Sequence, residues 1–335
     1  MTELGSEGFS PDTIDALLRV IKNEAAESAS SDDERIQAIT QVGNFLTENQ
    51  NTLASPRAMI CLTDVIREDV RPRVVTHAIS VLARVKAVSA VMLIVDVALG
   101  SNTELFDNAD ADRFRESDDC LRLRCAAVQA LGQFQDQRIV IPLMSILNDQ
   151  TVNYRLRMKA AESLGKAGDP HALTSLMRIL EDEREKSVYL KESSAKALGM
   201  LGDIRAMDSL LNILESKKGI RDKFDFLKER AIESIKRLMD GDEPGESNRV
   251  FESLINALQD EAPSIRLAAV EALAESGERR FIHDLRDVIF DSADDVAIAA
   301  IYAIFRLGGE DAIRDLRGLE NVPQFLRDEI ESFIP

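Results

Sequence analysis

Apolar side chains recur along most of the chain at the spacing of three and four residues that is typical of amphipathic helices. Tight turns such as Gly168-Asp-Pro170 and Gly202-Asp203 divide these helices into pairs. The first helix of each pair is predicted over residues 12–24, 56–68, 88–99, 136–148, 170–182, 204–216, 247–259, 279–291 and 309–319. The pattern therefore predicts an all-α chain built from helix pairs.

The second helices of the pairs share a repeated sequence pattern. The segment Arg124-Cys-Ala-Ala-Val-Gln-Ala-Leu-Gly132 matches Arg157-Met-Lys-Ala-Ala-Glu-Ser-Leu-Gly165 position by position. Aligning every copy on its small central residue, the anchor, gives positions 31 to 49 residues apart: Ala38, Ala78, Ala127, Ala160, Ser194, Ala231, Ala269 and Ala300. Internal repetition at this period is typical of a repeat array.

The apolar positions around the anchors define one buried arc on each second helix. The position four residues after the anchor is apolar in all eight copies, and the position four before it is apolar in all but Glu34. One pair alone does not bury such an arc, so neighbouring pairs must stack. We expect a right-handed α-solenoid of about eight to nine stacked helix pairs. It would form a single domain over residues 11–335, after a disordered N-terminus over residues 1–10. An irregular insertion loop is expected over residues 100–118 and an atypical C-terminal cap at about residues 309–335.

The phrase Arg-x-x-Ala-Ala-x-x-Leu-Gly, followed by Gly-Asp-Pro, resembles HEAT repeats, especially the short bacterial kind shared with phycobilin lyases (PBS lyase HEAT-like repeats). The resemblance covers nearly the whole chain from about residue 11, although the first pair and the copies around Lys228 and Ala297 depart from it. It implies a solenoid whose second helices line the concave surface. Its members include scaffolds, assembly factors, chromophore lyases and some DNA-repair enzymes, so it indicates the fold more strongly than the function.

A column of basic residues stands three positions before the anchors. It lies between two buried columns, so each cation is at least partly buried and requires a partner. Acidic residues at the helix-to-helix turns, among them Asp69, are suitable partners. We predict a structural ladder in which acids lock each turn to its helix; a ligand-binding ladder is the alternative. The predicted ladder consists of Arg35, Arg124, Arg157, Lys191, Lys228, Arg266, Asp149, Asp182 and Asp260.

A second basic pattern occupies the exposed side of the same helices. The chain as a whole is acidic, with 41 Lys and Arg against 59 Asp and Glu, a net charge of −18 and a pI near 4.7. Basic residues nevertheless outnumber acidic ones at the exposed positions of repeats two to six. This stripe predicts a basic concave groove for an acidic protein partner. The alternative is a solvated face whose charges balance acids on adjacent helices. The predicted partner-binding residues are Arg122, Arg155, Lys159, Lys166, Tyr189, Lys196, Phe226, Arg230 and Arg237.

No arrangement of residues indicates a reaction centre. The three histidines lie in different repeats, and none has serine, cysteine and acidic partners at a telling spacing. The three cysteines form neither a Cys-x-x-Cys pair nor part of a zinc set. We therefore expect no catalytic residue, no metal site and no cofactor.

The leading hypothesis is a non-catalytic protein-protein interaction scaffold or assembly factor. The resemblance implies an alternative, a phycobilin lyase-like enzyme or chromophore-handling chaperone that acts on phycobiliproteins and holds a bilin in the basic groove. The acidic pI and the few exposed aromatic residues argue against nucleic acid as a partner. The longest apolar run, about Val91 to Val95, is too short to span a membrane, and the first ten residues lack the order of a secretory signal. Together with the three unpatterned cysteines, these features predict a cytoplasmic protein.

Overall fold

The computed structural model describes residues 11–23, 30–48, 55–101, 103–107, 111–216, 221–239, 247–320 and 322–333. Every regular element within these residues is a helix. The chain divides into two compact units, Met1–Ser175 (unit 1) and Leu176–Pro335 (unit 2). The predicted disordered N-terminus, residues 1–10, lies outside the described residues, and the single domain over residues 11–335 stays a prediction.

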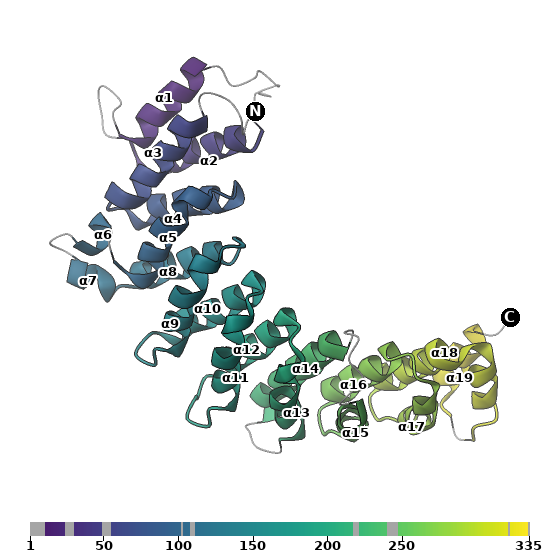
Figure 1. Cartoon of the computed structure of the whole chain (residues 1–335). Helices are drawn as coiled ribbons and strands as arrows, with labels where there is room; N and C mark the ends of the chain where they lie inside the picture. Colours follow the sequence, from purple (N-terminus) through teal and green to yellow (C-terminus); the bar gives the residue numbers. More distant parts are fainter. Residues whose placement is uncertain are drawn as a thin grey trace. The chain divides into compact units, whose positions relative to one another are not determined.

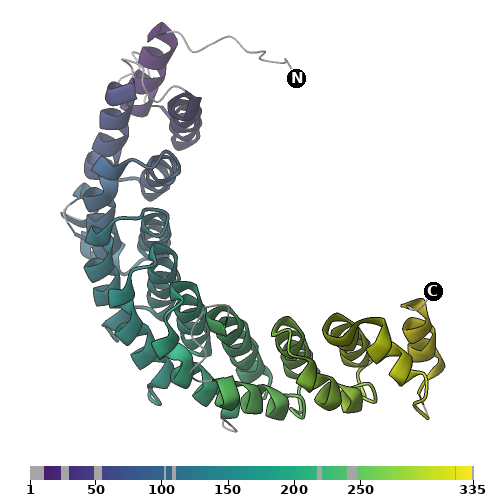
Figure 2. The ribbon, with the colours of Figure 1, turned by 45° about the vertical axis from the view of Figure 1, so that its right-hand side comes forward.

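Unit 1 consists of four helix pairs in two layers (Figures 1 and 2). Each second helix contacts its own first helix, and each of the first three also contacts the second helix of the next pair. The first helices also contact their neighbours, so the pairs stack as predicted. The first helices are α1 (Pro11–Ile21), α3 (Ser55–Glu68), α5 (Val91–Leu99) and α9 (Val140–Asn148). The second helices are α2 (Asp32–Glu48), α4 (Pro72–Arg84), α8 (Asp118–Leu131) and α10 (Tyr154–Ala167).

Unit 2 begins within α11 (Leu173–Glu181) and continues the same pattern. α18 bends at Gly309, whose φ of 67° is left-handed, so its second half serves as the first helix of the last pair. Counted over both units, the described residues form nine pairs, which confirms the predicted all-α stack of eight to nine helix pairs. The other helices are α12 (Val188–Leu201), α13 (Met207–Glu215), α14 (Arg221–Met239), α15 (Ser247–Ala257), α16 (Pro263–Glu275), α17 (Ile282–Val288), α18 (Asp294–Leu316) and α19 (Gln324–Ser332).

The buried arc of each second helix forms the core. All eight anchors are buried, and so are the apolar residues four positions before and after them. Glu34, the exception in this pattern, takes part in a capping box at the start of α2. The Ser31 N–H donates to Glu34 Oε2 at 2.8 Å, and the Glu34 N–H donates to Ser31 Oγ at 3.2 Å. The sequence departs from the apolar pattern there because a helix N-terminus needs polar partners.

Five first helices begin with a short 3₁₀ turn where the sequence predicted continuous helix. Side chains of Asp136, Asp169 and Asp203 accept the backbone N–H two residues further on, at 2.9–3.0 Å. Gly168 and Gly202, with φ of 69° and 68°, end the preceding helices in the left-handed conformation. The 3₁₀ turns are η1 (Val88–Ala90), η2 (Gln137–Ile139), η3 (Pro170–Ala172), η4 (Ile204–Ala206) and η5 (Arg279–Phe281).

The predicted insertion over residues 100–118 contains two short helices, α6 (Glu104–Asp107) and α7 (Ala111–Arg115). Phe106 is buried, and its ring centroid lies 5.5 Å from that of Phe114. The Arg115 guanidinium donates to the Phe106 carbonyl, and α6 and α7 contact α3 and α8, respectively. The described part of this segment is therefore packed against the helix pairs of unit 1.

One stretch of the described chain, Val88–Phe106, has the length and mean hydropathy of a membrane-spanning helix, although the sequence predicted none. These properties are weak support for a span, because a buried core helix has them too. In the structure the stretch is divided by Gly100, whose φ is 79°, into η1 with α5 on one side and α6 on the other. α5 contacts α3, α8 and α9.

Glycines allow adjacent second helices to approach closely at equivalent positions of the two units. A Cβ atom on Gly132 of α8 would lie 2.9 Å from the Ser163 Cα of α10, and one on Gly199 of α12 would lie 2.8 Å from the Ser234 Cα of α14. The Ser234 hydroxyl donates to the Ala195 carbonyl at 2.9 Å. Glycine and serine together thus form a recurring close contact between second helices.

Candidate functional site

The nine predicted partner-binding residues lie on second helices of both units. In unit 1, Arg122 lies on α8, and Arg155, Lys159 and Lys166 lie on α10. The two helices contact each other, and Arg122 and Arg155 occupy equivalent positions five residues before their anchors. Lys159 is half-buried, whereas the other three side chains are exposed. Unit 1 therefore presents a row of cations on adjacent helices.

Unit 2 adds aromatic residues to this pattern. Tyr189 and Lys196 lie on α12, and Phe226, Arg230 and Arg237 lie on α14, which contacts α12. Tyr189 and Phe226 again occupy equivalent positions, five residues before their anchors, and are 53% and 61% exposed. Two aromatic side chains so exposed at matching places on neighbouring helices are a candidate contact surface.

Carboxylates pair with two of the four cations of unit 1. Arg122 Nη1 lies 3.6 Å from Asp119 Oδ1, in a pair whose side chains are both well exposed. Lys159 Nζ lies 2.9 Å from Glu162 Oε2. Ion pairs exposed to this extent contribute little to stability, but they reduce the positive charge that a partner would meet.

Carboxylates also pair with two cations of unit 2. Arg230 pairs with Glu233 of its own helix and, at 3.3 Å, with Glu192 of α12. Arg237 lies 2.9 Å from the same Glu233. The predicted excess of positive charge is therefore smaller than the sequence columns indicated. Three exposed cations of the predicted set form no ion pair with a described carboxylate: Arg155, Lys166 and Lys196.

The sequence indicates the two acidic partners of Arg230 to different degrees. Glu192 lies two positions before its anchor, outside the exposed columns, and reaches Arg230 only because α12 and α14 stack. The pairing of Arg230 with Glu233 follows the three-residue spacing that brings side chains together on a helix, a signal already present in the sequence. The exposed Tyr154 is not in the predicted set, because it precedes the column of Arg155 by one residue.

Burial shifts the pKa of one histidine and two cysteines of the described residues. His77 Nε2 of α4 lies 2.7 Å from Thr40 Oγ1 of α2, and burial, with a contribution from Arg84, lowers the pKa of His77. Burial raises the pKa of Cys120 and of Cys125, which disfavours the nucleophilic thiolate. No group of three or more His, Cys, Asp or Glu side chains in the described part of the chain could hold a metal ion.

Four of the six predicted ladder cations bind the end of their own first helix. Arg35 Nε donates to the Ile21 carbonyl at 2.7 Å, and Arg157 Nε donates to the Leu147 carbonyl at 2.9 Å. Arg124 and Lys191 make the equivalent bonds to carbonyls of α5 and α11, each at 3.0 Å. The last carbonyls of a helix have no partner within it and carry partial negative charge, so a cation is well suited to them.

At three joints the acidic partner of a ladder cation belongs to the next pair and not to the turn of the cation's own pair. Lys228 Nζ lies 2.7 Å from Asp260 Oδ2, at the turn between α15 and α16. Arg266 binds Asp291, beyond α17, through two contacts of 2.6 Å. The physical reason is the stacking, which places the turn of one pair beside the second helix of the pair before it. The other two predicted acids stabilise their own turns: Asp149 accepts the N–H of Thr151, and Asp182 accepts that of Arg184.

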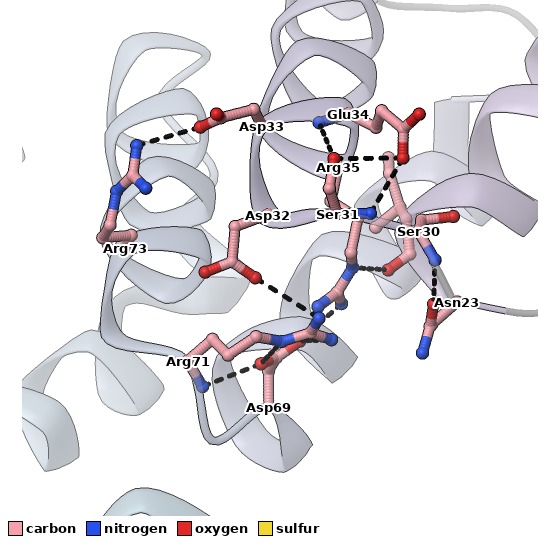
Figure 3. A network of polar contacts seen from close by, with 11 residues as sticks. Asn23, Ser30, Ser31, Asp32, Asp33, Glu34, Arg35, Asp69, Arg71 and Arg73 are labelled. Carbon is pink, nitrogen blue, oxygen red and sulfur yellow. Dashed lines mark hydrogen bonds and ion pairs between the residues drawn. The ribbon is translucent and has the colours of Figure 1, made fainter. Parts of the chain in front are cut away.

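The most buried of these pairs joins Arg35 of α2 to Asp69, at the turn between α3 and α4 (Figure 3). The two side chains are 3% and 6% exposed. Asp69 also accepts the Arg71 N–H at 2.8 Å and Arg71 Nε at 3.2 Å. Burial by itself raises the pKa of Asp69, but hydrogen bonds from Arg35 and Arg71 outweigh it and leave the pKa below its usual value. The pair is thus ionised and fully desolvated.

Comparison with protein families explains this arrangement. The model of HEAT repeats matches residues 112–189 and 251–332, and the model of the PBS lyase HEAT-like repeat matches residues 190–216. Together these matches cover more than half of the chain and include most of the stacked pairs described above. The chain belongs to the HEAT-repeat family. The HEAT-repeat matches leave out α1 to α6 and α14.

Solved structures share the HEAT-repeat fold with this chain. The structure of Kap95p with RanGDP has a TM-score of 0.60 at 12% identity, over 96% of this chain and 47% of that one. The structure of the karyopherin Kap121p with the extreme C-terminus of the protein phosphatase Cdc14p has a TM-score of 0.59 at 16% identity, over 96% and 37%. The chain thus spans less than half of either, and these identities show the fold alone.

The CpcE–CpcF complex of phycocyanin lyase from Nostoc sp. PCC7120 is similar at 20% identity, over 66% of this chain and 92% of that one. Its TM-score of 0.40 is too low to carry an argument about this chain. A search of the curated proteins finds no match.

Proposed function

We propose that this HEAT-repeat chain is a non-catalytic interaction scaffold or assembly factor that binds an acidic protein through the exposed face of α12 and α14. The observation that carries the proposal is the matched exposure of Tyr189 and Phe226 on these two adjacent helices. Aromatic side chains dominate the energetics of protein interfaces. Lys196, which forms no ion pair with a described carboxylate, adds positive charge beside them, and charge complementarity favours an acidic partner.

The cations of unit 1 supply a second region for the same kind of partner. Arg155 and Lys166 are exposed on α10 and form no ion pair with a described carboxylate. Solenoids present binding surfaces of this type on their stacked helices. A cytoplasmic location agrees with this role and is part of the proposal.

Replacing both aromatic residues, Tyr189→Ser with Phe226→Ser, should weaken partner binding by about 30-fold or more, because interface hot spots typically contribute at least about 2 kcal/mol. Capture of partners from native lysate by the wild-type chain, with quantitative mass spectrometry, identifies the protein to test. Titration with that purified protein then measures the loss. Phe290→Ser is the matched control, since Phe290 is 50% exposed but lies after α17.

Undiminished binding by the folded double variant would exclude this face. The acidic nature of the partner is tested separately with Lys196→Glu, which should weaken binding by a factor that shrinks as salt is added. If the loss of binding in Lys196→Glu does not depend on salt, or if the captured partner is basic, the electrostatic part of the proposal is wrong.

A lyase-related role is the second candidate, and the match of residues 190–216 to the PBS lyase HEAT-like repeat favours it. In this alternative the cations hold the propionates of a bilin while a phycobiliprotein receives it. Mixing the chain with a free bilin tests the idea through the visible absorbance spectrum. An unchanged spectrum at saturating protein would exclude chromophore handling.

A further inference from the structure

Unit 1 contains a cavity of about 350 Å³ between the end of α1, the beginning of α2 and the α3–α4 turn. Its size is within the range of small-molecule sites in proteins. Neither the predicted partner-binding face nor any residue of unit 2 takes part in it. The cavity is lined by Lys22, Asn23, Arg35, Cys61, Asp64, Val65, Glu68, Asp69, Val70 and Arg71.

Arg35 leaves one buried donor unused in this cavity. Its side chain is 3% exposed, Nε donates to the Ile21 carbonyl, and Nη2 pairs with Asp69. Nη1 is buried and has no hydrogen-bond partner among the described residues. An unsatisfied buried donor on a charged group is costly, so a bound acceptor atom would be strongly favoured there.

The α3 side of the cavity supplies the opposite charge. Asp64 has two long ion pairs, 3.8 Å to Lys22 Nζ and 3.7 Å to the exposed Arg67, and Glu68 is exposed. Asp69, in contrast, is saturated by Arg35 and Arg71. The lining contains three cationic and three acidic side chains, so its charges balance. A ligand with a net positive or negative charge would therefore add a buried charge without a partner.

We propose that this cavity binds a small zwitterion of the free α-amino acid class. Its carboxylate accepts from Arg35 Nη1, and its ammonium group faces Asp64 and Glu68. Cys61, Val65 and Val70 provide an apolar wall for a short aliphatic side chain. Neutral overall, such a ligand satisfies both the unused donor and the available carboxylates without adding net charge.

The test uses the full chain and three probes of similar shape: L-valine, isovalerate, which lacks the ammonium, and isobutylamine, which lacks the carboxylate. Calorimetric titration should show saturable binding of L-valine that is about tenfold or more tighter than either analogue. Asp64→Asn should weaken L-valine binding by about tenfold. Asp15→Asn is the matched control and should change it by less than about twofold, because Asp15 pairs with Arg57 on the surface, outside the cavity.

A second readout reports on the acceptor contact itself. The ¹⁵N-edited NMR signal of the Arg35 guanidinium should shift with the same saturation curve as the heat of binding. Equal binding of isovalerate and L-valine would overturn the assignment of a zwitterion. Failure of all three probes to bind would overturn the site and leave Arg35 Nη1 to an ordered water molecule.

Discussion

Asp69→Ala should lower the free energy of unfolding of the α2–α4 region by about 3 kcal/mol or more. The substitution leaves the Arg35 guanidinium buried without its counter-charge, and breaking a desolvated ion pair from one side typically costs about 3–5 kcal/mol. Because the chain has no tryptophan, chemical denaturation is best followed by circular dichroism. Native-state hydrogen exchange of the α2 and α4 amides locates the loss, since repeat arrays open locally.

Asp33→Ala is the matched control for this substitution. Asp33 also pairs with an arginine, Arg73, at 3.0 Å, but both side chains are largely exposed, at 80% and 70% (Figure 3). Exposed pairs contribute between 0 and about 1 kcal/mol, so a small change is expected. If the two variants lose the same stability, burial is not what makes the Arg35–Asp69 pair important.

The same pair predicts how stability depends on pH. The folded-state pKa of Asp69 lies below its usual value of 3.8, so the ionised pair stabilises the fold fully above pH 3.8. That stabilisation is lost as the pH falls through the lower, folded-state pKa. The stability difference between the wild-type chain and Asp69→Ala should therefore stay constant from neutral pH to about pH 4 and then shrink. A difference that already shrinks near pH 6 would contradict the assignment to Asp69.

Gly199→Ala should destabilise unit 2 by about 1–3 kcal/mol, although the same change inside a free helix stabilises by about 1 kcal/mol. The added Cβ would lie 2.7 Å from the Ser234 Cβ and 2.8 Å from its Cα, so α12 and α14 must move apart. Moving them also strains the hydrogen bond from Ser234 to the Ala195 carbonyl. Thermal unfolding followed by circular dichroism measures the effect, and its sign decides between packing and helix propensity.

Lys196→Ala is the control on the same helix. Lys196 is exposed, and surface substitutions of this kind usually change stability by less than about 0.5 kcal/mol. A Gly199→Ala variant as stable as the control would show that the close approach of α12 and α14 relaxes without cost.

The stacked pairs could be predicted from the sequence because their cause is local and repeated. Each anchor and the apolar positions around it indicate which arc of a helix is buried, and the same pattern occurs in eight copies. The 3₁₀ turns were missed, since an aspartate that caps its own turn, such as Asp203, changes the first residues of a helix without changing its apolar spacing.

The ion pairs and the cavity of the candidate sites depend on contacts between helix pairs. The sequence of a single repeat does not encode these contacts. Arg230 was predicted to bind a partner, with charge balance by acids on adjacent helices as the alternative, and stacking does bring Glu192 to it from the neighbouring helix. At three joints the carboxylate that binds a ladder cation comes from the next pair, because the offset between pairs is a tertiary property. The cavity around Arg35 had no sequence signal, since it needs the ends of three helices together.

The ion pairs of the ladder connect neighbouring helix pairs in one consistent order along the chain. At three joints the earlier pair contributes the buried cation and the later pair the carboxylate, as for Arg35 with Asp69 and Arg266 with Asp291. A truncated protein that ends after α2 would keep Arg35 without Asp69, and one that ends after α16 would keep Arg266 without Asp291. One that starts at α3 would instead keep Asp69 with Arg71 as its remaining cation. Shortening from the C-terminal side at these joints should therefore be tolerated less well than shortening from the N-terminal side.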